Sequence, residues 1–184
     1  MAKPKVATTS LAGCFGCHMS LLDIDDRILK LIELVDFDKS PIDDIKKFTG
    51  PVEIGLVEGG CCSEENVAVL QDFRKYCKIL ISVGDCAIGG GIPAMRNSIP
   101  LSECYEEAFL NGRRGPEIHN PEGVVPNDPE LPLLLDKVYP CHEVVKIDYH
   151  LPGCPPPADT LWNALVALLT DKPVDLPYEL IKYD

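Results

Sequence analysis

The feature that most constrains this chain is a repeated pattern: a run of apolar residues is followed closely by glycine and cysteine. Helical apolar spacing separates successive runs. Strands that alternate with helices predict a parallel sheet, and right-handed crossovers then place every loop that follows a strand at the same edge. The pattern therefore predicts an α/β domain in which cysteines far apart in the sequence meet. The runs cover residues 5–10, 52–58, 78–83 and 143–149.

The segments between these runs predict the remaining elements. A helix is expected from Ser20, with Asp23 as its capping partner, and Ser63 is expected to cap a second helix. Residues 115–140 are rich in proline and glycine and predict a long loop. The other expected elements are a short edge strand at 35–37, a helical turn at 43–48 and helices at 102–110 and 158–170.

Composition narrows the class of protein. At 184 residues the chain is long enough for one well-packed domain, 1–184, and its 46% hydrophobic and 25% charged residues are ordinary for a globular fold. The net charge of -12 disfavours binding to nucleic acid or to an anionic membrane surface. No apolar secretory segment follows the first residues, so we expect a cytoplasmic protein whose nine cysteines are reduced or bound to metal.

The first cysteine loop has the spacing of a metal-binding motif. Cys14 and Cys17 are separated by two residues, so both sulfurs can point into one concavity. Gly13 and Gly16 let backbone N–H groups approach an anion closely. The spacing alone is equally typical of a thioredoxin-like dithiol, of half a zinc site or of an iron-sulfur ligand pair.

Two single cysteines complete the set, because Cys86 and Cys154 also follow predicted strands. Open α/β sheets bind ligands at this edge. Four thiolates suit zinc, but structural zinc usually takes two close pairs. One pair with two remote single cysteines, each beside glycine or proline, favours a 4Fe-4S cluster, which needs ligands from several directions.

Four motifs, taken in order, closely resemble the small subunit of nickel-iron hydrogenases, and the resemblance covers nearly the whole chain. It implies a single flavodoxin-like, doubly wound domain with Cys14, Cys17, Cys86 and Cys154 as ligands of one 4Fe-4S cluster at the carboxyl edge of the strands. The motifs are Gly13-Cys14-Phe15-Gly16-Cys17, Glu58-Gly59, Gly84-Asp85-Cys86-Ala87 followed by Gly89-Gly90, and Gly153-Cys154-Pro155-Pro156.

The sequence is most similar in type to the cytoplasmic, NAD-reducing soluble (bidirectional) hydrogenases. No twin-arginine leader is expected, the last predicted helix lies near residue 184, and residues 148–156 follow that group's pattern. The resemblance implies a non-catalytic electron relay in an enzyme that reduces NAD with H2. The nickel-iron centre is then expected on a large subunit, and FMN and NAD on diaphorase subunits. The alternative is a related complex I-like oxidoreductase, whose first motif has adjacent cysteines instead.

Other residues near the predicted site have two interpretations each. The family resemblance implies that Glu58 lies near the path of protons and beside the cluster ligands. A carboxylate at a strand end is, however, commonly a helix cap. Asp85 is expected to disfavour added electrons by like-charge repulsion. Cys61 and Cys62 are adjacent and are expected not to be ligands, and Cys141 beside His142 is too little for a metal site.

Overall fold

The computed structural model describes residues 3–111 and 120–181 and contains a five-stranded parallel sheet at its centre. The strands lie in the order β2-β1-β3-β5-β7, all paired in parallel. Numbered within the sheet, this order is 2-1-3-4-5, which is the flavodoxin-like arrangement. The strands are β1 (Lys5–Ser10), β2 (Asp36–Phe37), β3 (Val52–Glu58), β5 (Cys77–Val83) and β7 (Tyr149–Leu151).

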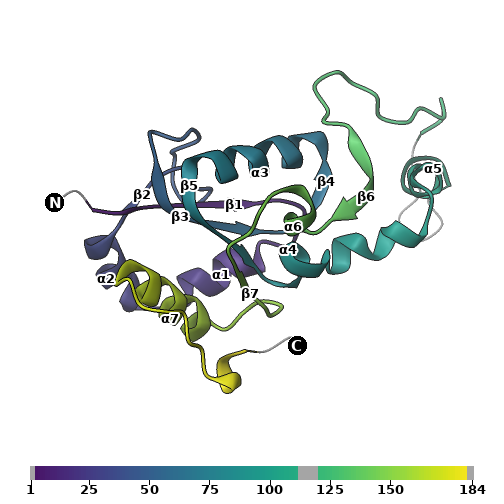
Figure 1. The fold of residues 1–184 in the computed structure, drawn as a ribbon. Helices are drawn as coiled ribbons and strands as arrows, with labels where there is room; N and C mark the ends of the chain where they lie inside the picture. The colour runs from purple at the N-terminus through teal and green to yellow at the C-terminus, as the bar shows by residue number, and fades with distance from the viewer. Residues whose placement is uncertain (1–2, 112–119, 182–184) are drawn as a thin grey trace.

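Helices cover both faces of this sheet (Figure 1). On one face lie α1 (Gly16–Leu22), α2 (Arg27–Leu34) and α7 (Ala158–Leu169). On the other lies α3 (Glu64–Tyr76). A doubly covered sheet needs apolar residues on both faces of its strands, which explains the nearly continuous apolar run in β5. The fold class predicted from the sequence is confirmed.

The core has two parts, one on each side of the sheet. Successive strand residues point to opposite faces, so Val6 packs with the α1, α2 and α7 residues while Ala7 packs with those of α3. Leu161 and Leu165 of α7 are fully buried in the first part, and Leu70 and Phe73 of α3 in the second. The two parts of the core thus pack against the strands from whose carboxyl ends the cysteine loops extend.

A smaller unit extends from the carboxyl edge of the sheet. Strand β4 (Cys61–Ser63) pairs antiparallel with β6 (Leu134–Tyr139), and α4 (Asp85–Gly89), the 3-10 helix Ile92–Ser98 and α6 (Cys141–Val144) lie nearby. The helix α5 (Leu101–Tyr105) continues as a π-helix over Glu106–Asn111. A final 3-10 turn spans Tyr178–Leu180. In the described part of the chain, no helix has the length and apolar character that crossing a membrane requires.

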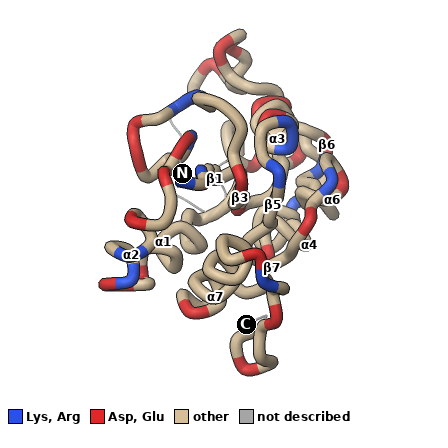
Figure 2. Tube along the Cα trace, turned by 60° about the vertical axis from the view of Figure 1, so that its left-hand side comes forward, with Lys and Arg blue, Asp and Glu red and all other residues tan. Residues whose placement is uncertain are grey.

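Acidic residues are spread over the surface. Figure 2 shows the Asp and Glu segments distributed over the helices and the connecting loops, with the fewer Lys and Arg segments among them. The net charge of -12 is therefore a property of the whole chain rather than of one element. A broadly acidic surface favours solubility and repels polyanions.

Several element predictions were wrong. The first helix begins at Gly16, not at Ser20, and is interrupted at Asp25, whose φ of 56° is left-handed. No helical turn forms at 43–48. Residues 143–149 form the end of α6, a loop and only the first residue of β7, because Val144 packs against the core from α6 and Val145 and Ile147 do so from the loop.

Two further segments form strands where the sequence predicted loops. Cys61 and Cys62 lie in β4, and the end of the predicted 115–140 loop forms its partner β6. Residues 120–133 of that loop have no helix or strand, and 115–119 lie outside the described residues. The N-cap prediction was correct: Ser63 accepts a hydrogen bond from the Asn66 backbone N–H.

Candidate metal centre

The four predicted cysteines line one hollow at the carboxyl edge of the sheet. The loop after β1 and the start of α1 supply Cys14 and Cys17, α4 supplies Cys86, and the loop after β7 supplies Cys154. Glycine, proline, Glu58 and Asp85 complete the lining of the hollow. Cys17 and Cys86 are half-buried, whereas Cys14 and Cys154 are exposed. The structure thus brings together all four cysteines that the sequence singled out.

Glycines form a cradle around the sulfurs. A Cβ atom on Gly84 would overlap Cys17 Sγ, and one on Gly91 would lie 2.8 Å from Cys86 Sγ. Both glycines also have a positive φ, 81° and 49°, which other residues adopt only with strain. The sequence motif includes Gly89 and Gly90, whereas the close approach to Cys86 Sγ is at the next glycine, Gly91. Two cysteine sulfurs can therefore occupy their places only because these positions lack side chains.

Glu58 caps the helix that carries Cys17. Its Oε2 accepts a hydrogen bond of 3.0 Å from the backbone N–H of His18, in the first turn of α1. The helix-cap interpretation of this carboxylate is therefore supported by a direct contact. His18 Nδ1 and Glu58 Oε1 lie 3.1 Å apart, but not in hydrogen-bond alignment, and both atoms are buried without another partner.

A row of buried polar side chains runs from His18 past Thr8 of β1 to Ser40. His18 Nε2 lies 2.9 Å from Thr8 Oγ1, and Thr8 Oγ1 lies 2.7 Å from Ser40 Oγ. All these side chains are at least 90% buried. The sequence does not indicate this contact, because Thr8 and Ser40 carry no motif that relates them to His18.

The local electrostatics oppose free thiolates in the hollow. Burial and the adjacent Glu58 carboxylate raise the pKa of the Cys17 thiol, and burial also raises the pKa of Cys86, although a hydrogen bond from the Ile92 backbone N–H lowers it. Burial alone would raise the pKa of Glu58, but the nearby His18 ring, the Ser10 side chain and the hydrogen bond from the His18 backbone N–H bring it below its usual range. Thiolates beside an ionised carboxylate need a compensating positive charge, which bound metal supplies.

The arrangement of donors bears on both kinds of metal site considered above. Across residues 3–111 and 120–181, no three side chains of His, Cys, Asp or Glu converge as ligands of one metal ion do. The four cysteines instead surround a hollow with glycine backbone at its walls. Such an arrangement fits a cluster wider than one ion, with N–H donors such as that of Ile92 near the sulfurs.

The remaining cysteines lie outside the hollow. Cys61 and Cys141 are fully buried, and the hydrogen bond between their thiols lowers the pKa of Cys61 and raises that of Cys141. Cys62 lies 3.3 Å from Asn66 Oδ1, and Cys77 is buried at the start of β5. None of these, nor Cys104, lines the hollow.

The chain matches a family model over most of its length. Residues 14–168 match the family described as NADH ubiquinone oxidoreductase, 20 Kd subunit. The chain therefore belongs to this family, and the fold and the loops described above lie within the matched region.

Within that family, the similarity is to hydrogenase subunits. The chain is 48% identical to the NAD-reducing hydrogenase HoxS subunit delta of Cupriavidus necator, over 99% of this chain and 86% of that protein. It is 38% identical to a subunit of the F420-non-reducing hydrogenase of Methanothermobacter thermautotrophicus, over 95% of this chain but only 56% of that protein. The chain is thus a small subunit of the nickel-iron hydrogenase type.

A solved structure supports the same assignment. A chain from the crystal structure of an NAD+-reducing [NiFe]-hydrogenase in the H2-reduced state superposes with a TM-score of 0.93 at 49% identity, covering 99% of both chains. A [NiFeSe]-hydrogenase of Desulfomicrobium baculatum, 17% identical with a TM-score of 0.57, shares the fold. The resemblance predicted from the four motifs is confirmed.

Proposed function

We propose that this chain is the electron-transfer small subunit of an NAD-reducing nickel-iron hydrogenase. In this proposal Cys14, Cys17, Cys86 and Cys154 hold one 4Fe-4S cluster. The observation that carries it is the convergence of these four cysteines, from three separate segments, on one glycine-lined hollow. When bound, the cluster supplies one-electron transfer between the hydrogen-oxidising centre of a partner and a flavin.

The chain's own residues prepare the site for that group. Gly84 and Gly91 leave room for the sulfurs of Cys17 and Cys86, and the Ile92 N–H donates to the Cys86 sulfur. Glu58 fixes the first turn of α1, and with it Cys17, through the His18 backbone N–H. These contacts orient ligands before any metal binds, which is how surrounding residues tune a metal site.

The partners follow from the relatives. The names of one relative and of one solved structure, each nearly half identical to this chain, describe NAD-reducing hydrogenases. We propose a large subunit that carries the nickel-iron centre, together with diaphorase subunits that carry FMN and bind NAD. All nine cysteines are free, which suits a reducing compartment, and we propose that the enzyme works in the cytoplasm.

A second candidate is a cluster-bearing subunit of a complex I-like oxidoreductase, which the name of the matched family favours. The two candidates share the cluster and differ in the electron donor. H2-dependent reduction of NAD by the assembled complex separates them, because only the hydrogenase takes electrons from H2.

The test is a pair of cysteine variants in the assembled complex. Cys86 lies in the hollow and Cys104 lies outside it, and both are half-buried. We expect Cys86→Ser to abolish H2-dependent NAD reduction and Cys104→Ser to retain it. Full activity in Cys86→Ser would contradict the electron-transfer role, and loss in both variants would show that the effect is not specific to the hollow.

A further inference from the structure

The loop that carries Cys154 is fastened to the loops of the other three cysteines by two side chains, and we propose that these, Asp85 and Ser20, are positioning residues for Cys154. This inference rests on the proposed function, because it concerns the proposed ligand. Cys154 is exposed, so packing around its side chain restrains it little. Its place is set instead by hydrogen bonds to the backbone of its loop.

Asp85 joins the loops of Cys86 and Cys154 by a reciprocal pair of hydrogen bonds. Its Oδ1 accepts from the Gly153 N–H at 3.1 Å, and its backbone N–H donates to the Gly153 carbonyl at 3.0 Å. Asp85 and Gly153 each immediately precede a proposed ligand. The two contacts therefore fix the spacing between the backbones that carry Cys86 and Cys154.

Ser20 joins the same loop to the helix of Cys17 from the other side. Its Oγ, on the second turn of α1, donates to the Pro156 carbonyl at 2.5 Å, and the side chain is buried. The contact spans 136 positions in the sequence. The sequence pattern predicted that Ser20 caps a helix, whereas in the structure its hydroxyl donates to the Pro156 carbonyl.

Gly153 makes the loop depend on these contacts. Its φ is 136°, and an added Cβ would lie 2.6 Å from Pro156 Cα, so only glycine fits the turn. Glycine has more conformational freedom than any other residue, and the fixed turn therefore needs external restraint. Asp85 supplies that restraint before Cys154, and Ser20 supplies it after.

The role of Asp85 depends on its hydrogen-bond acceptor and not on its charge. Asn presents an amide oxygen at the same place, so Asp85→Asn keeps an acceptor for the Gly153 N–H, whereas Asp85→Ala removes it. Comparing the two variants separates positioning from electrostatics. Asp159→Ala is the matched control, because this carboxylate lies just after the same loop and pairs with Arg27 at a side-chain exposure of 58%.

The experiment measures cluster retention in the complex purified without oxygen. Iron and acid-labile sulfide are determined, the reduced protein is examined by electron paramagnetic resonance, and the rate of iron release to a chelator is followed. We expect Asp85→Ala to release iron about tenfold faster and to change the spectrum, since altered outer contacts typically cost roughly 10-fold or more in metal affinity. Asp85→Asn and Asp159→Ala should release iron at close to the wild-type rate.

Ser20→Ala gives an independent measurement if Asp85→Ala does not fold. We expect it to speed iron release severalfold, because only the bond at Pro156 is lost. Wild-type release rates in both Asp85→Ala and Ser20→Ala would overturn the inference while the proposed function stands. Equal acceleration in Asp85→Asn and Asp85→Ala would overturn it as well, by assigning the effect to charge. Absence of iron and sulfide from the wild-type chain would overturn the proposed function and this inference together.

Discussion

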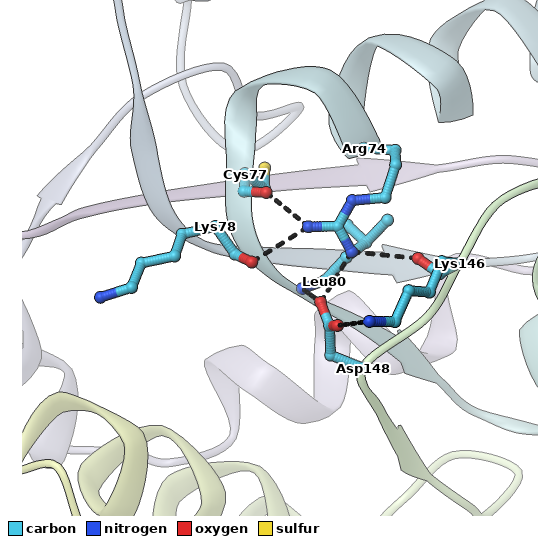
Figure 3. A network of polar contacts seen from close by, with 6 residues as sticks. All are labelled: Arg74, Cys77, Lys78, Leu80, Lys146 and Asp148. Carbon is cyan, nitrogen blue, oxygen red and sulfur yellow. Dashed lines mark hydrogen bonds and ion pairs between the residues drawn. The ribbon is translucent and has the colours of Figure 1, made fainter.

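The two edges of the central sheet hold their polar groups in opposite ways. At the edge where β5 begins, a network joins Arg74 of α3 to the segment that enters β7 (Figure 3). Arg74 Nη1 lies 2.7 Å from Asp148 Oδ2 and donates to the Lys146 carbonyl, while Nη2 donates to the carbonyls of Cys77 and Lys78. Asp148 also accepts from the Leu80 N–H. The Arg74 and Asp148 charges are thus matched within the chain.

At the carboxyl edge the polar groups are arranged around a shared hollow. The four cysteines line it, and Glu58 and His18 keep buried atoms without a hydrogen-bond partner. Glycines replace side chains beside the sulfurs. The edge where the strands begin therefore contributes mainly to stability. At the opposite edge, some buried polar atoms lack hydrogen-bond partners, and the loops there present the proposed ligands. Substitutions at the two edges should therefore have separable effects.

The largest effect is expected from Gly84→Ala. The new methyl group would overlap Cys17 Sγ, and φ at this position is 81°, so both the sulfur and the backbone must shift. We expect cluster content and H2-dependent activity to fall more than tenfold, with stability reduced by about 1–3 kcal/mol. Iron analysis and chemical denaturation measure the two effects.

Gly89→Ala is the matched control for that variant. A Cβ at Gly89 meets nothing within 4 Å, and its φ is not positive. Activity near wild type is expected. An equal loss in both glycine variants would contradict the claim that the cradle is specific to the sulfurs.

Arg74→Ala should have the reverse effect, on stability rather than on the cluster. It removes four hydrogen bonds and leaves Asp148, whose side chain is 23% exposed, without its main partner. We expect a loss of about 2–3 kcal/mol in urea unfolding, with the cluster spectrum unchanged at temperatures where the protein is folded. A changed spectrum in the folded variant would contradict the separation of the two edges.

Asp38, which directly follows β2 and lies outside the hollow, provides a pH-dependent test of stability. Burial alone would raise its pKa, but hydrogen bonds from Thr49 and Lys5 lower it from 3.8 to about 2. Because the folded pKa is depressed, the stabilisation is present above pH ~4 and is lost as the pH falls towards 2. Asp38→Asn should therefore cost about 2 kcal/mol at pH 7 and flatten the acid limb of the stability curve.

The control for Asp38 is Asp44→Asn, an exposed aspartate in the same loop region. It should leave both the stability at neutral pH and the acid limb close to wild type. If Asp38→Asn retained the full wild-type pH dependence between about 4 and 2, the assigned ionisation would be wrong.

The smallest effect is expected at the Ser63 cap of α3, on the face remote from α1. Ser63 Oγ accepts from the Asn66 N–H, so Ser63→Ala should cost about 1 kcal/mol. Thermal unfolding measures this loss, and Ser63→Asn, which can cap in the same way, should restore most of it. Equal thermal stability of the alanine and asparagine variants would contradict the capping role of Ser63.

Sequence patterns predicted those parts of the structure that depend on local chemistry. Apolar runs and a parallel crossover rule were sufficient to place Cys14, Cys17, Cys86 and Cys154 at one edge, where the structure has them. The failures lie where tertiary contacts override local preference. Val144, Val145 and Ile147 have the pattern of a strand, but Val144 ends α6, Val145 and Ile147 lie in a loop, and all three pack against the second part of the core.

Contacts between distant segments were beyond the reach of the sequence. Ser20 has the composition of a helix cap, yet its hydroxyl bonds to Pro156, and no local pattern encodes that partner. The sequence suggested that Glu58 caps a helix but did not indicate which one. The fold shows that the helix is α1, which carries Cys17. Side-chain hydrogen bonds across long sequence separations depend on the packing of whole elements, which periodicity does not specify.

The most direct measurement of the central claim is the metal content of the assembled complex purified without oxygen, compared with a variant in which Cys17 and Cys86 are both serine. Iron, acid-labile sulfide and zinc are determined in each. The proposal predicts that the variant loses about four iron and about four sulfide per complex while zinc is unchanged. Equal iron and sulfide in the two complexes, with one zinc lost from the variant, would contradict it.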